Sequence, residues 1–190
     1  MPIKALDTRK LAMLTVLSAL CMALQLAPRP PNVEFTSFFA FMVGLMQGAI
    51  GGALFGCFVM FANGFLSPYG FAGLNMPFQI IGMALAGVLG GVYRWYMSAR
   101  ARRTSWARFC AEAAILGAFI ALIYDLITNI GVGVSFILAG MNPALAIFSA
   151  IAYGAFFSII HIFSNTVVFG VLTLPSVNAL NNLIRSNKVG

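Results

Sequence analysis

The residues able to do chemistry are few, and they lie inside apolar runs. Asp125 stands in the run 121–133, and Asn129 follows it by four residues. On a helix this spacing places both polar side chains on one face. A carboxylate in the middle of a membrane span costs roughly 2.5–3.5 kcal/mol, so it normally faces a bundle interior or a wet cavity and finds a partner there. The pair therefore predicts a buried polar site.

A later apolar run repeats this spacing with His161 and Asn165, and Tyr153 precedes the histidine by about two turns. Acidic residues and histidines inside membranes commonly form proton relays, so a relay between Asp125 and His161 is one interpretation. Two others stay open: the histidine is the floor of a binding pocket, or it is a satisfied partner of Asp125 or of a backbone carbonyl.

The sequence carries no pattern typical of catalysis or metal binding. It contains no G-x-S-x-G, no H-E-x-x-H and no G-x-x-x-x-G-K-[ST] motif, which argues against an intramembrane hydrolase and against nucleotide hydrolysis by the P-loop route. Cys21, Cys57 and Cys110 have no C-x-x-C spacing and so indicate neither a disulfide framework nor a metal site. We expect no catalytic residue, no metal and no cofactor.

Composition places these residues in a membrane. Hydrophobic residues make up 61% of the 190 residues, charged residues 8%, and the mean hydropathy is +0.96, whereas a soluble domain has about 25% charged residues. The net charge of +7 comes from short basic blocks between apolar runs, as in cytoplasmic loops. No basic and aromatic interleaving accompanies it, so we expect no nucleic-acid partner.

Loop charges decide the number of membrane crossings. The run 35–66 contains 32 residues without a charge, which as one helix would be about 48 Å long, too long for one upright span and short for two. Two crossings, hinged near Gln47 and Gly48, put the N-terminus, the basic block 94–108 and the C-terminal tail on one side, as the positive-inside rule favours. We expect an all-α integral membrane protein with six transmembrane helices and cytoplasmic N- and C-termini.

The expected helices form a single domain over 1–190 and span roughly 8–27, 34–47, 48–65, 75–97, 107–138 and 144–174, with a cytoplasmic tail over 175–190. In this topology the loop 63–75 lies outside. It is rich in glycine, proline and aromatic residues and has no charge, so it either covers a pocket or is a plain interfacial connector.

Polar residues in the outer halves of the last three helices are expected to converge with Glu34 and the 63–75 loop on one cavity. The candidate substrate-binding residues are Glu34, Asn63, Tyr69, Asn75, Gln79, Asp125, Asn129, Tyr153 and His161.

Small residues mark faces for close helix contact. Ala12, Thr15, Ala19 and Ala23 form one stripe on the first helix, and glycine recurs at every fourth position over 44–56. Such patterns let helices approach closely. The stripe on the first helix either packs inside the protein's own bundle or docks a second membrane protein.

These features together resemble the substrate-binding S component of an energy-coupling factor (ECF) transporter. The resemblance covers the whole chain and rests on six helices with a basic fourth-to-fifth connection, on the Ala19-x-x-x-Ala23 pattern, and on the segments PNVEF at 31–35, YDLITN at 124–129 and HIFSN at 161–165.

The resemblance implies a capture subunit in the prokaryotic cytoplasmic membrane that binds a vitamin or related micronutrient from outside and performs no chemistry. Its partners would be a transmembrane coupling protein and two ABC-type ATPases. Ala12, Ala19 and Ala23 would form the docking face. Glu34, the loop after the third helix and the outer halves of the last three helices would line the ligand site. Riboflavin, cobalamin, pantothenate and other vitamins all stay open as the ligand.

Two other functions are compatible with the sequence. A self-sufficient proton-coupled carrier using Asp125 and His161 predicts uptake that needs no ATPase, although the internal repeat that such carriers often show is not visible. A structural membrane protein predicts no bound small molecule.

Overall fold

The computed structural model describes residues 8–68, 70–99 and 105–186. Their regular structure is helical throughout, without a strand in these ranges, which confirms the all-α prediction. The elements are α1 (Thr8–Leu26), α2 (Thr36–Gln47), α3 (Ala49–Leu66), the 3-10 helix η1 (Gly73–Asn75), α4 (Met76–Ala99), α5 (Trp106–Leu138) and α6 (Pro143–Ser186).

Four of the described helices are long and apolar enough to cross a membrane, over Ala49–Leu66, Gly73–Met97, Trp106–Leu138 and Pro143–Ala179. Two shorter apolar stretches, Leu11–Leu26 and Thr36–Gln47, belong to α1 and α2. Several long apolar helices indicate a multi-pass membrane protein.

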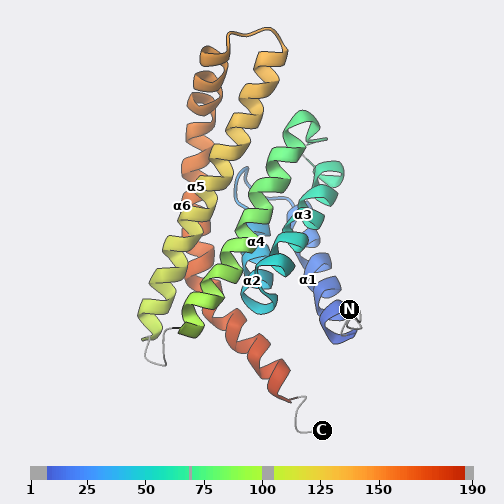
Figure 1. Cartoon of the computed structure of the whole chain (residues 1–190), viewed down its shortest axis with the longest axis vertical. Helices are drawn as coiled ribbons and strands as arrows, with labels where there is room; N and C mark the ends of the chain where they lie inside the picture. The colour runs from blue at the N-terminus through green and yellow to red at the C-terminus, as the bar shows by residue number, and fades with distance from the viewer. Residues whose placement is uncertain (1–7, 69, 100–104, 187–190) are drawn as a thin grey trace.

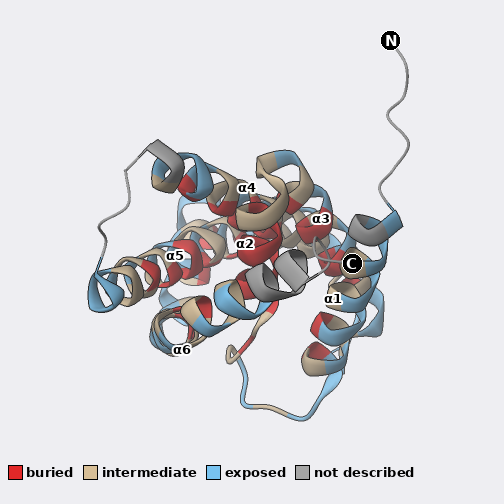
Figure 2. Cartoon of the chain, turned by 90° about the horizontal axis from the view of Figure 1, so that it is seen from below, coloured by how far each residue is buried: buried red, intermediate tan, exposed pale blue. Residues whose placement is uncertain are grey.

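The helices are arranged around α2. Figure 1 shows α5 and α6 side by side as a long hairpin on one flank, α2, α3 and α4 in the middle, and α1 on the other flank. Residues 36–44 of α2 are all buried, and Figure 2 shows this helix in red among its neighbours. The short second helix is therefore the core element that the others cover.

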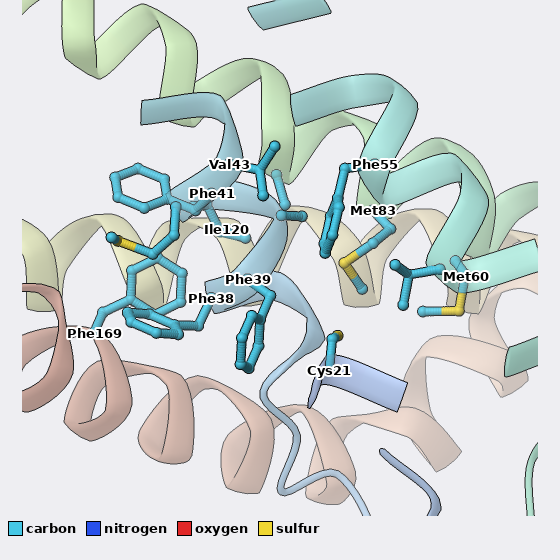
Figure 3. Close-up of a cluster of buried hydrophobic side chains, with 14 of the residues drawn as sticks. Cys21, Phe38, Phe39, Phe41, Val43, Phe55, Met60, Met83, Ile120 and Phe169 are labelled. Atoms are coloured by element: carbon cyan, nitrogen blue, oxygen red, sulfur yellow. The ribbon is translucent and has the colours of Figure 1, made fainter. Parts of the chain in front are cut away.

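Aromatic side chains fill the core between α2 and α6. The ring of Phe169 lies 5.5 Å from that of Phe38 and 5.2 Å from that of Phe41, both at steep angles (Figure 3). Edge-to-face and tilted contacts of this kind are favoured by the ring quadrupoles. They fix α6 against the start of α2, next to the loop that carries Glu34.

A single glycine separates α2 from α3. Gly48 has φ 93° and donates its N–H to the Gly44 carbonyl at 2.8 Å. A Cβ at this position would meet nothing within 4 Å, so the reason for glycine is the positive φ, which other residues rarely adopt. The hinge expected near Gln47 and Gly48 is confirmed.

Glycine also sets the contact of α3 with α4. A Cβ on Gly52 would collide with the carbonyl oxygen of Gly87, and a Cβ on Gly87 would collide with the Gly52 backbone. The backbones of α3 and α4 therefore lie in close contact, as the recurrence of glycine at every fourth residue of 44–56 predicts.

α6 runs further than expected. The sequence predicts a helix end at 174 and a tail over 175–190, whereas the helix continues through Pro175 to Ser186. A proline inside a helix removes one backbone hydrogen bond and kinks the helix without always ending it, and the last part of α6 runs at an angle to the rest (Figure 1). The other predicted helix ends lie within two residues of the observed ones.

Candidate functional site

A cavity of about 480 Å³ lies between the loop after α1, the segment after α3, and the helices α4, α5 and α6. Its polar lining residues are Gln25, Arg29, Asn32, Glu34, Asn63, Ser67, Asn75, Gln79, Tyr124, Asp125, Thr128, Asn129, Ser158 and His161.

Seven of the nine predicted substrate-binding residues line this cavity: Glu34, Asn63, Asn75, Gln79, Asp125, Asn129 and His161. Tyr69 lies outside the described residues. The neighbouring residues Ser67, Gly70 and Phe71 line the cavity, so the segment after α3 does form part of its wall.

Tyr153 does not line the cavity. Its side chain is 79% exposed on α6, and the cavity face of that helix carries Gly154, Phe157, Ser158 and His161. Residues eight apart on a helix point about 80° away from each other. The spacing of about two turns before His161 therefore turns Tyr153 to the outer surface.

Three ionisable side chains meet at one wall of the cavity. His161 Nδ1 lies 2.8 Å from Asp125 Oδ1, and His161 Nε2 lies 3.1 Å from Glu34 Oε1. The histidine is 2% exposed, and both carboxylates are buried. We call Glu34, Asp125 and His161 the carboxylate–histidine cluster. It joins α6, α5 and the loop before α2.

The geometry of the cluster fixes its charge. A neutral imidazole has one N–H, yet both ring nitrogens of His161 face a carboxylate oxygen. Satisfying both contacts requires an imidazolium between two carboxylates, or a neutral imidazole with one carboxyl group protonated. The cluster carries a net charge of −1 in either arrangement.

Glu34 also binds the start of α2. Its carboxylate accepts the backbone N–H groups of Thr36 and Ser37 and the hydroxyl of Ser37, at the end of a helix where negative charge is favoured. Burial would raise the pKa of Glu34, but the hydrogen bond and charge of His161 and the hydrogen bonds from Ser37 outweigh it and lower the pKa to about 2. Glu34 is therefore an ionised link between α2 and α6.

Glycines make room for two carboxamides of the cavity. A Cβ on Gly154 would meet the side chain of Asn129, and a Cβ on Gly131 would meet Asn75 Oδ1. The side chain of Asn129 on α5 thus lies directly against the backbone of α6, and that of Asn75 in η1 lies against the backbone of α5. These notches are not visible in the sequence, because each glycine faces a residue distant along the chain.

Some lining residues were not predicted. Tyr124 contacts the cluster, with its ring edge-on to His161 at a centroid distance of 5.6 Å. Ser158 lies three residues before His161 on the same face of α6, a spacing that does indicate it. Arg29 donates to the backbone carbonyls of Val33 at 2.9 Å and Gln25 at 3.2 Å, and nothing in its proline-rich surroundings distinguishes it from an ordinary loop charge.

Four buried oxygen atoms of the lining have no hydrogen-bond partner among the described residues: Asn63 Oδ1, Asn75 Oδ1, Gln79 Oε1 and Asp125 Oδ2. A buried polar atom without a partner costs about 1–3 kcal/mol. Such atoms are uncommon in folded proteins, and each one calls for an explanation, such as a water molecule or an ion that completes the bonding.

The cluster is poorly suited to metal binding or to nucleophile activation. Both nitrogens of His161 are already within hydrogen-bond distance of a carboxylate, which leaves no ring nitrogen for a metal ion or a serine hydroxyl. In the ranges that the structure covers, no group of His, Cys, Asp and Glu side chains is arranged to hold a metal ion.

Comparisons with family models, with curated proteins and with solved structures found no match for this chain.

Proposed function

We propose that this chain is the substrate-binding S component of an ECF-type transporter: a subunit that captures a vitamin or related micronutrient and delivers it to an ATP-driven coupling module. The observation that supports this most is the cavity itself. Its volume of about 480 Å³ falls in the range of small-molecule sites, and its wall combines carboxamides, carboxylates and aromatic rings inside an apolar helix bundle.

The position of the cavity supports capture from outside the cell. It lies at the end of the α2–α3 hairpin where Glu34 and Asn63 are found. At the opposite end, Arg94 donates to the carbonyl of Met46 beside the hinge. The positive-inside rule assigns the arginine-rich end to the cytoplasm, with both termini there too. The cavity then opens outward, in the cytoplasmic membrane of a prokaryote.

The outer face of α1 supports a docking role. Ala12, Ala19 and Ala23 are exposed, whereas Cys21 on another face of the helix is buried in the core. A stripe of small residues left uncovered on a membrane helix allows another helix to approach closely. In the proposed complex the occupant is the transmembrane coupling protein, which carries two ABC-type ATPases. This chain then needs no catalytic residue or cofactor of its own.

The test is ligand capture by the purified full-length protein. Mass spectrometry is expected to find a small molecule that copurifies, and Asn129→Ala is expected to lower its affinity about tenfold through a lost hydrogen bond in a buried site. Tyr153→Phe, at an exposed position outside the cavity, is the matched control and should bind normally. Unchanged affinity in both Asn129→Ala and Asp125→Asn would contradict the site.

A second function is favoured by the carboxylate–histidine cluster. One proton shared among Glu34, Asp125 and His161 is also what a proton-coupled carrier uses. That function predicts uptake into vesicles that contain this chain alone, driven by a pH gradient and abolished by an uncoupler. Uptake that requires the ATPases and survives the uncoupler would exclude it.

A further inference from the structure

We infer that the cavity selects a ligand with a positively charged, N–H-bearing nitrogen group, bound by Asp125 and by carboxamides of the same cavity. The inference rests on the proposed function, since it names the chemical class of the molecule that the binding subunit would capture.

The charge of the cavity wall favours a cation. The carboxylate–histidine cluster holds a net charge of −1 whichever of its groups carries the proton, because both nitrogens of His161 face carboxylates. A charge in a low-dielectric interior strongly favours an opposite charge nearby. Arg29 also lines the cavity and donates to the carbonyls of Gln25 and Val33. Its charge balances that of the cluster overall, which favours one localised positive group over a polycation.

The second carboxylate oxygen of Asp125 needs a hydrogen-bond donor. His161 occupies Oδ1 of Asp125, while Oδ2 of the same carboxylate is buried without a partner. With one proton shared in the cluster, a proton on Asp125 would sit on Oδ1, which faces His161. Oδ2 is therefore an acceptor in either arrangement, so the group that completes it must be a donor. A cationic N–H donor forms the shorter and stronger bonds with carboxylates.

The carboxamides extend the same preference. Asn63 Oδ1, Asn75 Oδ1 and Gln79 Oε1 are further buried acceptors without a partner in the described chain. Asn63 is itself only 8% exposed. Several acceptors in the same cavity as a carboxylate match a group with several N–H bonds, such as an ammonium, an amidinium or a protonated amino-heterocycle.

Aromatic rings complete the environment. Tyr124 and Phe157 both line the cavity. Aromatic faces attract cations through the ring quadrupole, most strongly where water is excluded. The same wall would give an anion no comparable benefit.

Three molecules of nearly equal shape test the inference: benzamidine, which is a cation with N–H donors, benzamide, which is neutral, and benzoate, which is an anion. Binding to the purified full-length protein is measured at millimolar concentrations by the shift of the unfolding temperature. Benzamidine should bind at least tenfold more tightly than benzamide, and benzoate should not bind. Equal binding of all three, or a preference for benzoate, would overturn the inference.

Two variants locate the effect. Asp125→Asn should reduce the preference for benzamidine over benzamide to near parity. Since this change also touches the contact with His161 and risks misfolding, Gln79→Ala provides an independent test that leaves the cluster intact. It should weaken benzamidine severalfold, while the exposed control Tyr153→Phe should have no effect. A benzamidine preference that survives both cavity variants would place the binding elsewhere and overturn the inference.

The copurifying molecule separates the two proposals. A molecule with a cationic nitrogen group supports both. A neutral or anionic molecule, bound in the cavity and released by Asn129→Ala, would overturn the charge preference and leave the binding function standing. If nothing copurifies and none of the three probes binds, the proposed function fails and the inference fails with it.

Discussion

At the scale of residues, the carboxylate–histidine cluster does two things at once. It ties the loop before α2 to α5 and α6 through the contacts of His161 with Glu34 and Asp125. It also leaves one carboxylate oxygen, Asp125 Oδ2, without a protein partner at the cavity wall. Removing one partner of a buried ion pair typically costs about 3–5 kcal/mol because a charge stays buried unpaired. The same three side chains therefore hold the elements of the cavity wall together and give that wall its negative charge.

Stability should fall in acid through Glu34. Burial would raise the pKa of the Glu34 carboxylate, but its contacts with His161 and Ser37 outweigh burial and lower that pKa from 4.5 to about 2. Its contribution to stability is therefore fully present above pH 4.5 and is lost as the pH falls from there towards 2. Unfolding temperatures measured in detergent from pH 6 to pH 2.5 should decline over this window.

The matched control for the acid effect is Glu34→Gln, which keeps the size of the side chain and cannot ionise. Asp125, which lies across His161 from Glu34, is the same in both proteins, so the difference between the two curves reports on position 34. The variant should be less stable than the natural protein at pH 6 and should approach it at pH 2.5. Parallel curves would show that the Glu34 carboxylate does not stabilise the fold.

At the scale of elements, the helices and most of the cavity were predictable because their signals are local. An uncharged run of 32 residues with Gly48 inside it predicts a hairpin. Polar pairs four residues apart, such as Asp125 and Asn129, predict the face that points inward. Tyr153 was misplaced because its position in the outer half of the last helix gives its depth and not the face of the helix on which it lies. The end of α6 was misplaced because Pro175 kinks the helix and does not stop it.

The rest of the site depends on neighbours that sequence spacing does not identify. Asn129 and Asn75 reach the cavity wall only where Gly154 and Gly131 leave space for them. Each of these pairs joins two helices, so the packing of the helices decides it. The contact of both nitrogens of His161 with carboxylates is likewise a property of three converging elements. The sequence offered the contact with Asp125 as one of several alternatives and did not indicate the contact with Glu34.

The notch at Gly154 can be tested directly. Its Cβ in Gly154→Ala would meet the carboxamide of Asn129, which must move away from the cavity. Ligand affinity should fall about tenfold or more, as for the loss of one buried hydrogen bond. Because the end of a side chain can move more readily than backbone, the free energy of unfolding should change by no more than about 1–2 kcal/mol. Both quantities are measured on the purified protein.

Gly170→Ala is the comparison on the same helix. Its Cβ would lie 3.2 Å from the Cβ of Ala114, and this position is not part of the cavity lining. It should alter stability modestly and leave ligand affinity unchanged. If Gly154→Ala binds as well as the natural protein, Asn129 does not contribute to binding from this position.

At the scale of the whole molecule, the two ends of the bundle differ. One end holds the cavity, built from the loop after α1 and the segment after α3. The other end holds the hinge at Gly48 and the contact of Arg94 with Met46. Between them α1 lies on the flank (Figure 1), and its small residues Ala12, Ala19 and Ala23 are exposed. This division allows capture and docking to be altered separately.

Docking is therefore expected to depend on α1 without affecting capture. In Ala19→Leu/Ala23→Leu, two exposed small residues become large ones, which prevents the close approach of a partner helix. Neither position lines the cavity. In vesicles that contain the coupling protein and its ATPases, uptake should fall at least tenfold, while ligand affinity of the isolated subunit stays unchanged.

The control for docking places the same substitution elsewhere. Ala152→Leu/Ala155→Leu changes two exposed alanines on α6 and should preserve both uptake and binding, because a larger apolar side chain is tolerated where it faces lipid. Loss of uptake together with binding in the α1 variant would indicate that Ala19 and Ala23 support the fold. Full uptake in that variant would place the coupling protein on another face, and the exposed stripe would then need a different explanation.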